Sequence, residues 1–126
     1  MAVDMEEFAA QVRSAMESGD PEKMSRLLHP DVHWGPAAEP DWGCRNRNEV
    51  ASWYLRARDE GARATVSEMV VGRKRLVVGL RVTGTPATEE SGGTVLRWQV
   101  MTTRDGLVAD IRGFGDRDEA LEVLSV

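Results

Sequence analysis

The sequence predicts an α+β fold in which three amino-terminal helices pack inside a curved, mainly antiparallel sheet with a pocket. Three observations support this fold class. Helical periodicity is confined to the first half of the chain, whereas apolar and polar residues alternate through most of the second half. An Asp-Gly pair at 105–106 separates two alternating runs within residues 94–115, which is typical of a tight β-hairpin. A sheet that follows helices in this order buries their apolar faces best by curling around them.

Composition predicts one domain that spans residues 1–126. With 41% hydrophobic and 29% charged residues, the chain resembles an ordinary globular protein and is long enough for a single core. We expect it to be cytoplasmic and without a membrane partner, because no apolar run approaches spanning length and no basic-then-apolar leader begins the chain. The net charge is −5 and the basic residues are scattered, so nucleic acid is not an expected partner.

Capping residues define the first two helices. Asp4 is a natural N-cap with Glu7 in capping-box register, and the helix is expected to stop at Gly19. Pro21 favours an immediate second helix, which we expect to end at His29-Pro30.

A short strand over residues 32–35 and a third helix follow. Asn46 caps this helix, and its apolar stripe includes Val50, Trp53 and Tyr54 before it ends at Gly61. We expect Trp53, like Phe8 of the first helix, to be buried between helix and sheet.

The second half predicts strands over residues 62–72 and 76–84, then the hairpin, then a short terminal helix. In the hairpin we expect Trp98 and Val100 to face the pocket, opposite small residues that leave room for a ligand. In the first of these strands an unbroken pleat would place Glu68 beside Val66 on an apolar face, whereas a bulge near Met69 would turn it away.

Four segments carry a resemblance to a known family: HPDVHWGP, GCRNRNEVASWYLRA, VVGLRVTGT and VLRWQVMTTRDGLVADIRGFGD. Across nearly its whole length the chain resembles the NTF2-like superfamily and, within it, the SnoaL-like group. The resemblance implies a cone whose open end holds a hydrophobic pocket, and a dimer that pairs through the outer face of the sheet. It says little about chemistry, because this scaffold hosts isomerases, polyketide cyclases, epoxide hydrolases, dehydratases and noncatalytic binding domains.

The catalytic residues of these relatives are mostly missing here. Ketosteroid isomerases place a base aspartate before a proline after the first strand, where this chain has Gly35, and a tyrosine on the first helix, which has none. Steroid isomerisation by that route is therefore disfavoured. Asp110 is the nearest match to the cyclase aspartate, and Asp110 with Arg112 partly matches the hydrolase relay.

Two sets of candidate site residues follow. The acid–base candidates are His33, Asp41, Glu68 and Asp110. The ligand-binding candidates are Trp34, Trp42, Tyr54, Trp98 and Val100. We expect neither a metal nor a cofactor, because Pro30 separates the only two histidines and Cys44 is alone.

Three functions remain open at this point. The chain is an acid–base enzyme of isomerase, cyclase or hydrolase type acting on a small hydrophobic metabolite, a noncatalytic ligand-binding domain, or a dimerisation module. The expected partners are a small hydrophobic or aromatic ligand and a second copy of the chain. The expected homodimer surface is the outer sheet face, with Arg97, Gln99, Met101, Arg112 and Phe114.

Overall fold

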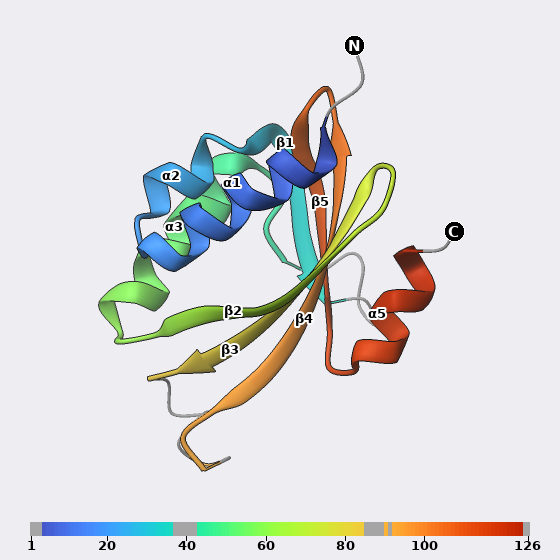
Figure 1. The fold of residues 1–126 in the computed structure, drawn as a ribbon. Coiled ribbons are helices and arrows are strands. Elements are labelled where there is room, and N and C mark those ends of the chain that lie inside the picture. The colour runs from blue at the N-terminus through green and yellow to red at the C-terminus, as the bar shows by residue number, and fades with distance from the viewer. Residues whose placement is uncertain (1–3, 37–42, 85–89, 91, 125–126) are drawn as a thin grey trace.

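The computed structural model describes residues 4–36, 43–84, 90 and 92–124 (Figure 1). The first part of the chain forms helices α1 (Met5–Ser18) and α2 (Pro21–Ser25), strand β1 (Leu28–Pro36) and helix α3 (Arg47–Asp59). The second part forms strands β2 (Arg63–Val71), β3 (Arg75–Thr83), β4 (Val95–Arg104) and β5 (Leu107–Phe114), and then helix α5 (Arg117–Leu124).

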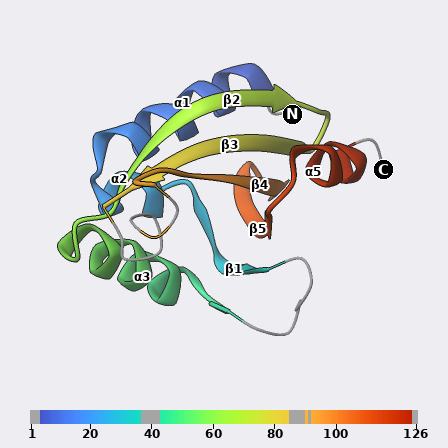
Figure 2. The same ribbon diagram turned by 90° about the horizontal axis from the view of Figure 1, so that it is seen from below.

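The five strands form one sheet in the order β1-β5-β4-β3-β2. Strand β1 pairs with β5 in parallel, and the other three pairs are antiparallel. Figure 2 shows that the sheet curves around α1, α2 and α3, while α5 lies on its other side. The predicted α+β fold with a curved, mainly antiparallel sheet is confirmed.

Local signals place most element boundaries. The Asp4 carboxylate accepts the backbone N–H groups of Glu6 and Glu7, and Asn46 caps α3 by accepting the N–H of Glu49. The turn between β4 and β5 has positive φ at both Asp105 and Gly106, 56° and 79°, as the Asp-Gly pair predicts.

One boundary differs from the prediction. Helix α2 ends at Ser25 and β1 begins at Leu28, so Pro30 lies inside a strand instead of ending a helix. Strand β1 is at the edge of the sheet, and its register with β5 shifts between Leu28 and His33. A proline without an N–H is tolerated at such an edge irregularity.

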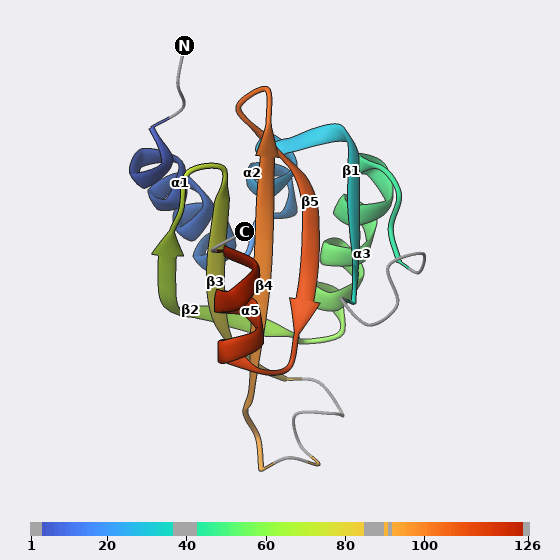
Figure 3. The same cartoon turned by 90° about the vertical axis from the view of Figure 1, so that its right-hand side faces the viewer.

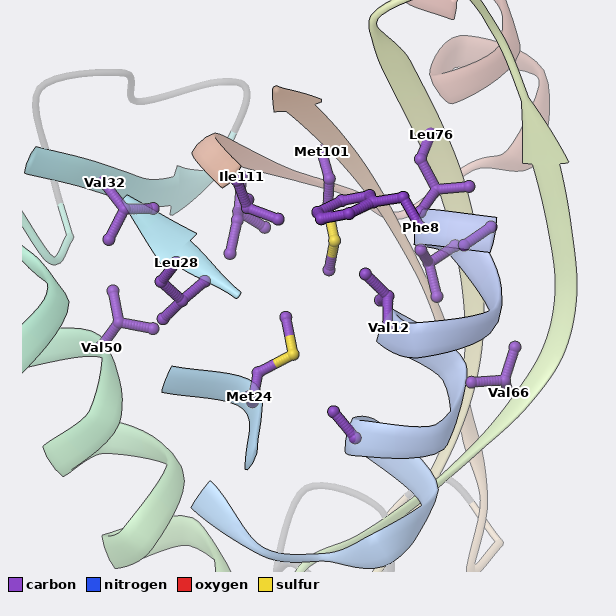
Figure 4. Close-up of a cluster of buried hydrophobic side chains, with 14 of the residues drawn as sticks. Phe8, Val12, Met24, Leu28, Val32, Val50, Val66, Leu76, Met101 and Ile111 are labelled. Carbon is purple, nitrogen blue, oxygen red and sulfur yellow. The ribbon is translucent and has the colours of Figure 1, made fainter. Parts of the chain in front are cut away.

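The main core lies between the three helices and the inner face of the sheet (Figure 4). Its fully or almost fully buried side chains come from all layers, with Phe8 and Val12 on α1 and Leu28 on β1. Strands β3, β4 and β5 contribute Leu76, Val78, Leu80, Met101 and Ile111.

The two faces of β4 are the reverse of the prediction. Met101 is fully buried in the main core, and Gln99 is on the same inner side. Val100 lies instead in a second cluster with Val77 and Ala120 beneath α5. Because α5 covers the outer side of β3 and β4 (Figure 3), both faces of β4 are buried and its alternation does not reveal which is inner. The outer surface predicted for a dimer is therefore wrong in Arg97, Gln99 and Met101, which lie on the inner side.

A bidentate ion pair holds α5 to the edge of the sheet. Register shifts between Val66 and Glu68, which turns Glu68 away from the inner face, as the bulge alternative anticipated. Arg117 at the start of α5 donates from Nε to Glu68 Oε1 at 2.7 Å and from a terminal nitrogen to Oε2 at 3.1 Å. This pair lowers the pKa of Glu68 through hydrogen bonding and charge.

Helix α3 buries only part of its predicted stripe. Val50 is fully buried, but Trp53 is 45% exposed, so the expectation that Trp53 fills the space between helix and sheet is wrong. Adjacent helical residues point about 100° apart, and the buried side is occupied by Val50 and Tyr54, one turn from each other.

Within the described ranges, no helix is both long enough and apolar enough to cross a membrane.

The Phe8→Ala variant should lose about 3–5 kcal/mol of unfolding free energy, because the cavity beside Met101 and Leu76 can be filled only in part. Phe8→Leu, which keeps most of the volume, should lose about 1 kcal/mol. Urea denaturation measures both changes. A loss under about 1 kcal/mol in Phe8→Ala would contradict the packing of α1.

The Glu68→Gln variant should melt at a lower temperature than the wild type near neutral pH. Arg117 holds the pKa of Glu68 below its ordinary value of 4.5 in the folded protein, so the stabilisation is present above pH 4.5 and is lost as the pH falls through the lowered pKa. Thermal melts across pH 3–7 (about the range in which carboxylates titrate) test this. Glu122→Gln, an equal charge change on the exposed side of α5, should show no such dependence.

Candidate functional site

A cavity of about 1360 Å³ lies between the helices and the inner face of the sheet, beyond the end of the core. It is bordered by residues of helices α1, α2 and α3 and by some residues of each of the five strands. Most of its wall is apolar, and it is open to solvent on one side. A concave, mostly apolar cavity with a few polar groups is typical of small-molecule sites.

Three aromatic rings form one wall. Trp34 of β1 stacks on Tyr54 of α3 with ring centroids 5.1 Å apart and planes at 25°. Trp53 meets Trp34 edge to face at 4.4 Å. Backbone hydrogen bonds of 2.9 and 2.8 Å between Trp34 and Cys44 fix the strand that carries the indole. The wall therefore presents aromatic surfaces suited to a flat ring.

Two buried polar atoms of the cavity wall have no hydrogen-bond partner among the described residues: the Tyr54 hydroxyl and Gln99 Oε1. Gln99 is 8% exposed. The Tyr54 residue as a whole is half-buried, whereas its hydroxyl is fully buried. Burial, and then the nearby Cys44, raise the pKa of Tyr54, so the phenol stays protonated and can donate.

Strand β4 passes from core to cavity to solvent on its inner side. Met101 is in the core, Gln99 is in the cavity wall, and Arg97 is exposed at the mouth. Arg97 pairs with Leu80, a core residue of β3, which places both on the inner face. Polarity therefore increases stepwise along one strand toward the opening.

Cys44 borders the cavity beside Tyr54. Burial, with a smaller contribution from Glu49, raises the pKa of its thiol, and Arg56 opposes this shift in part. A thiol with a raised pKa is a poor nucleophile at neutral pH. Cys44 therefore acts as a wall residue.

Three of the four predicted acid–base residues lie away from the cavity. His33 is in register with Asp110 and Trp34 with Ile111, so alternation turns Trp34 inward and His33 outward. On the outer face Arg112 Nε donates to Asp110 Oδ2 at 3.0 Å. His33 Nδ1 lies 3.6 Å from Asp110 Oδ1, longer than a hydrogen bond. Glu68 is paired with Arg117, and Asp41 falls outside the described residues.

The predicted ligand-binding residues separate into two groups. Trp34 and Tyr54 form the aromatic wall. Trp98 borders the cavity, but its ring packs in the second cluster, where it covers Gly79 so closely that a side chain there would collide with it. Val100 lies in that cluster outside the cavity, because β4 turns its other face inward. Trp42 is outside the described residues.

Three site residues were not predicted: Gln99, Arg97 and Trp53. Gln99 carried a usable signal, because an amide within an otherwise apolar stretch of a central strand is unusual. In the part of the chain that the structure describes, no cluster of three His, Cys, Asp or Glu residues could hold a metal ion.

The sequence matches the family described as SnoaL-like domain over residues 8–111. The chain belongs to the SnoaL-like domain family. This family is part of the NTF2-like superfamily, which confirms the resemblance read from the four sequence segments. No protein with curated annotation matches the chain.

Solved structures of low sequence identity share the fold. A candidate ketosteroid isomerase from Kribbella flavida superposes with a TM-score of 0.73 at 15% identity, covering 91% of this chain and 82% of its own. A candidate polyketide cyclase from Sinorhizobium meliloti gives 0.66 at 19% identity, with 86% and 94% covered. TerC, co-crystallised with polyporic acid, gives 0.64 at 19%, with 95% and 97% covered. At such identities the likeness establishes the fold alone.

The Tyr54→Phe variant should keep or raise the stability of the unliganded protein, by up to about 1 kcal/mol, because it removes a buried hydroxyl that has no partner. Thermal and urea denaturation measure this. A loss of more than about 1 kcal/mol would show that the hydroxyl is already hydrogen-bonded in the folded chain.

Proposed function

We propose that this SnoaL-like domain binds a small, mainly apolar, ring-bearing molecule in its cavity. The ring lies against Trp34 and Tyr54, and one polar group of the ligand bonds to the Tyr54 hydroxyl and the Gln99 amide. This proposal rests above all on the stacked Trp34 and Tyr54 rings in the wall of a large, mostly apolar cavity. The buried Tyr54 hydroxyl and Gln99 Oε1 in the wall of the same cavity lack partners among the described residues, so a ligand that reaches them after a small side-chain shift gains affinity by satisfying them.

Binding is favoured over acid–base catalysis by the positions of the titratable groups. Proton abstraction requires a base within hydrogen-bond reach of the substrate. The predicted bases His33, Glu68 and Asp110 do not border the cavity, and Tyr54 keeps its proton. Of the described carboxylates that do border it, Glu17 pairs with Arg13, Asp20 caps α2, and Glu60 lies at the end of α3. The co-crystallisation of TerC with polyporic acid supports a ligand-binding use of this scaffold.

Titration with the neutral fluorescent dye N-phenyl-1-naphthylamine tests the proposal. The dye should bind at one site per chain with a blue-shifted, enhanced emission, because its rings leave water for the aromatic wall. Trp34→Leu should weaken binding about tenfold or more, since the stacked face is lost.

Phe8→Leu is the matched control, because it alters a buried aromatic of the core that does not border the cavity. It should bind the dye as the wild type does. Absence of saturable dye binding to the folded wild type would reject the ligand-binding proposal and favour a dimerisation module.

A further inference from the structure

We propose that the ligand of this cavity is a ring-bearing organic anion whose carboxylate, or an equivalent acidic group, is held at the mouth by Arg97. The inference rests on the proposed function, because it uses the same cavity and the same aromatic wall. The inference adds that the ligand carries a negative charge and that Arg97 selects for that charge.

Arg97 is placed to meet the outer end of a ligand that reaches Gln99. The two residues are neighbours on the inner side of β4, two positions apart, which corresponds to about 6.7 Å along a strand. A ligand with an aromatic ring on Trp34 and an acidic group near the opening would contact both side chains. Gln99 then serves as the buried hydrogen-bonding partner and Arg97 as the charged one.

No carboxylate in the described part of the chain neutralises the Arg97 guanidinium. Within the described ranges, one of its terminal nitrogens donates a hydrogen bond to the carbonyl of Leu96, at 3.3 Å. Among residues 4–36, 43–84, 90 and 92–124, no carboxylate lies within 4.0 Å of it. A guanidinium presents a planar set of donors that matches a carboxylate in two parallel hydrogen bonds.

The other arginines at the cavity differ in how many hydrogen bonds and carboxylate partners they have within the described residues. Arg58 bonds to the carbonyl of Gly19 and lies 3.8 Å from the Asp59 carboxylate. Arg63 donates to the carbonyls of Arg58 and Ala62. Arg56, on α3, resembles Arg97 in having no carboxylate partner in the described part of the chain, and its charge reaches the cavity wall at Cys44.

The carboxylates around the cavity do not cancel these charges. Glu17 pairs with Arg13 at 3.4 Å, and Asp20 caps α2. Glu60 at the end of α3 is the remaining one among the described lining residues. Among the described lining residues, four arginines outnumber three carboxylates on a protein whose net charge is −5, which favours an anion at this place.

Calorimetric titration with 2-naphthoate and 2-naphthamide tests the inference, because these probes have the same ring and nearly the same shape but differ in charge. At about pH 7.5 the acid is ionised. Wild type should bind 2-naphthoate about fivefold more tightly than 2-naphthamide, and added salt should reduce the difference. Arg97→Gln should remove this preference by weakening 2-naphthoate binding more than 2-naphthamide binding.

Arg73→Gln is the matched control, since it removes the same charge from an exposed turn between β2 and β3 that does not border the cavity. It should keep the wild-type preference. Equal affinities for the two probes in wild type, or a preference that survives in Arg97→Gln, would overturn the role of Arg97 while dye binding still upheld the proposed function. If neither the probes nor the dye bind, the proposed function and this inference both fail.

Discussion

The burial of β3 on both faces is the constraint on which the rest of this structure depends. Five consecutive residues, Leu76 to Leu80, are buried, with alternate side chains in the main core and beneath α5. A strand can be covered on both sides only if helices supply apolar surface to each. The amino-terminal helices do so on the inner face, and α5 does so on the outer face with the help of the Glu68–Arg117 pair. The sheet is thus held as the middle layer of three.

The inner layer fills only part of the space that the curved sheet encloses. Helix α1 places Phe8 and Val12 against the sheet near Met101, and this end is closely packed. Toward the other end the inner side chains become an amide and a guanidinium, and α3 contributes flat rings instead of branched aliphatic groups. Core and cavity are therefore two ends of one interface between helices and sheet. The core ends and the cavity begins where the inner side chains change from apolar to polar.

Features that depend on neighbouring residues could be predicted from the sequence. Asp4, Asn46 and the Asp105-Gly106 turn each act through their own backbone surroundings, and each is found where expected. The inward orientation of Trp34 also follows from alternation with Val32, which is fully buried. These signals suffice for the fold class and for one wall of the site.

Features that depend on distant packing could not be predicted in the same way. The outer face of β4 is the more apolar of the two, and only the docking of α5 explains why Val100 is outer and Met101 inner. Only one of the adjacent residues Trp53 and Tyr54 can point toward the sheet from α3, and the sequence does not show that Tyr54 is the one that stacks on Trp34. The orientation of Glu68 depends on a bulge and on its pairing with Arg117, which is far away in the sequence.

The stepwise arrangement along β4 has a consequence for the evolution of such domains. Under the proposed function, the residues nearest the opening, Arg97 and Gln99, would discriminate among ligands, whereas Met101 farther along the same strand lies in the core. Exchanges at the first two positions can alter chemical preference without loosening the helices from the sheet. Under that proposal, specificity and foldability lie in separate segments of a single strand, so a scaffold of this kind would acquire new ligands by small mutational steps.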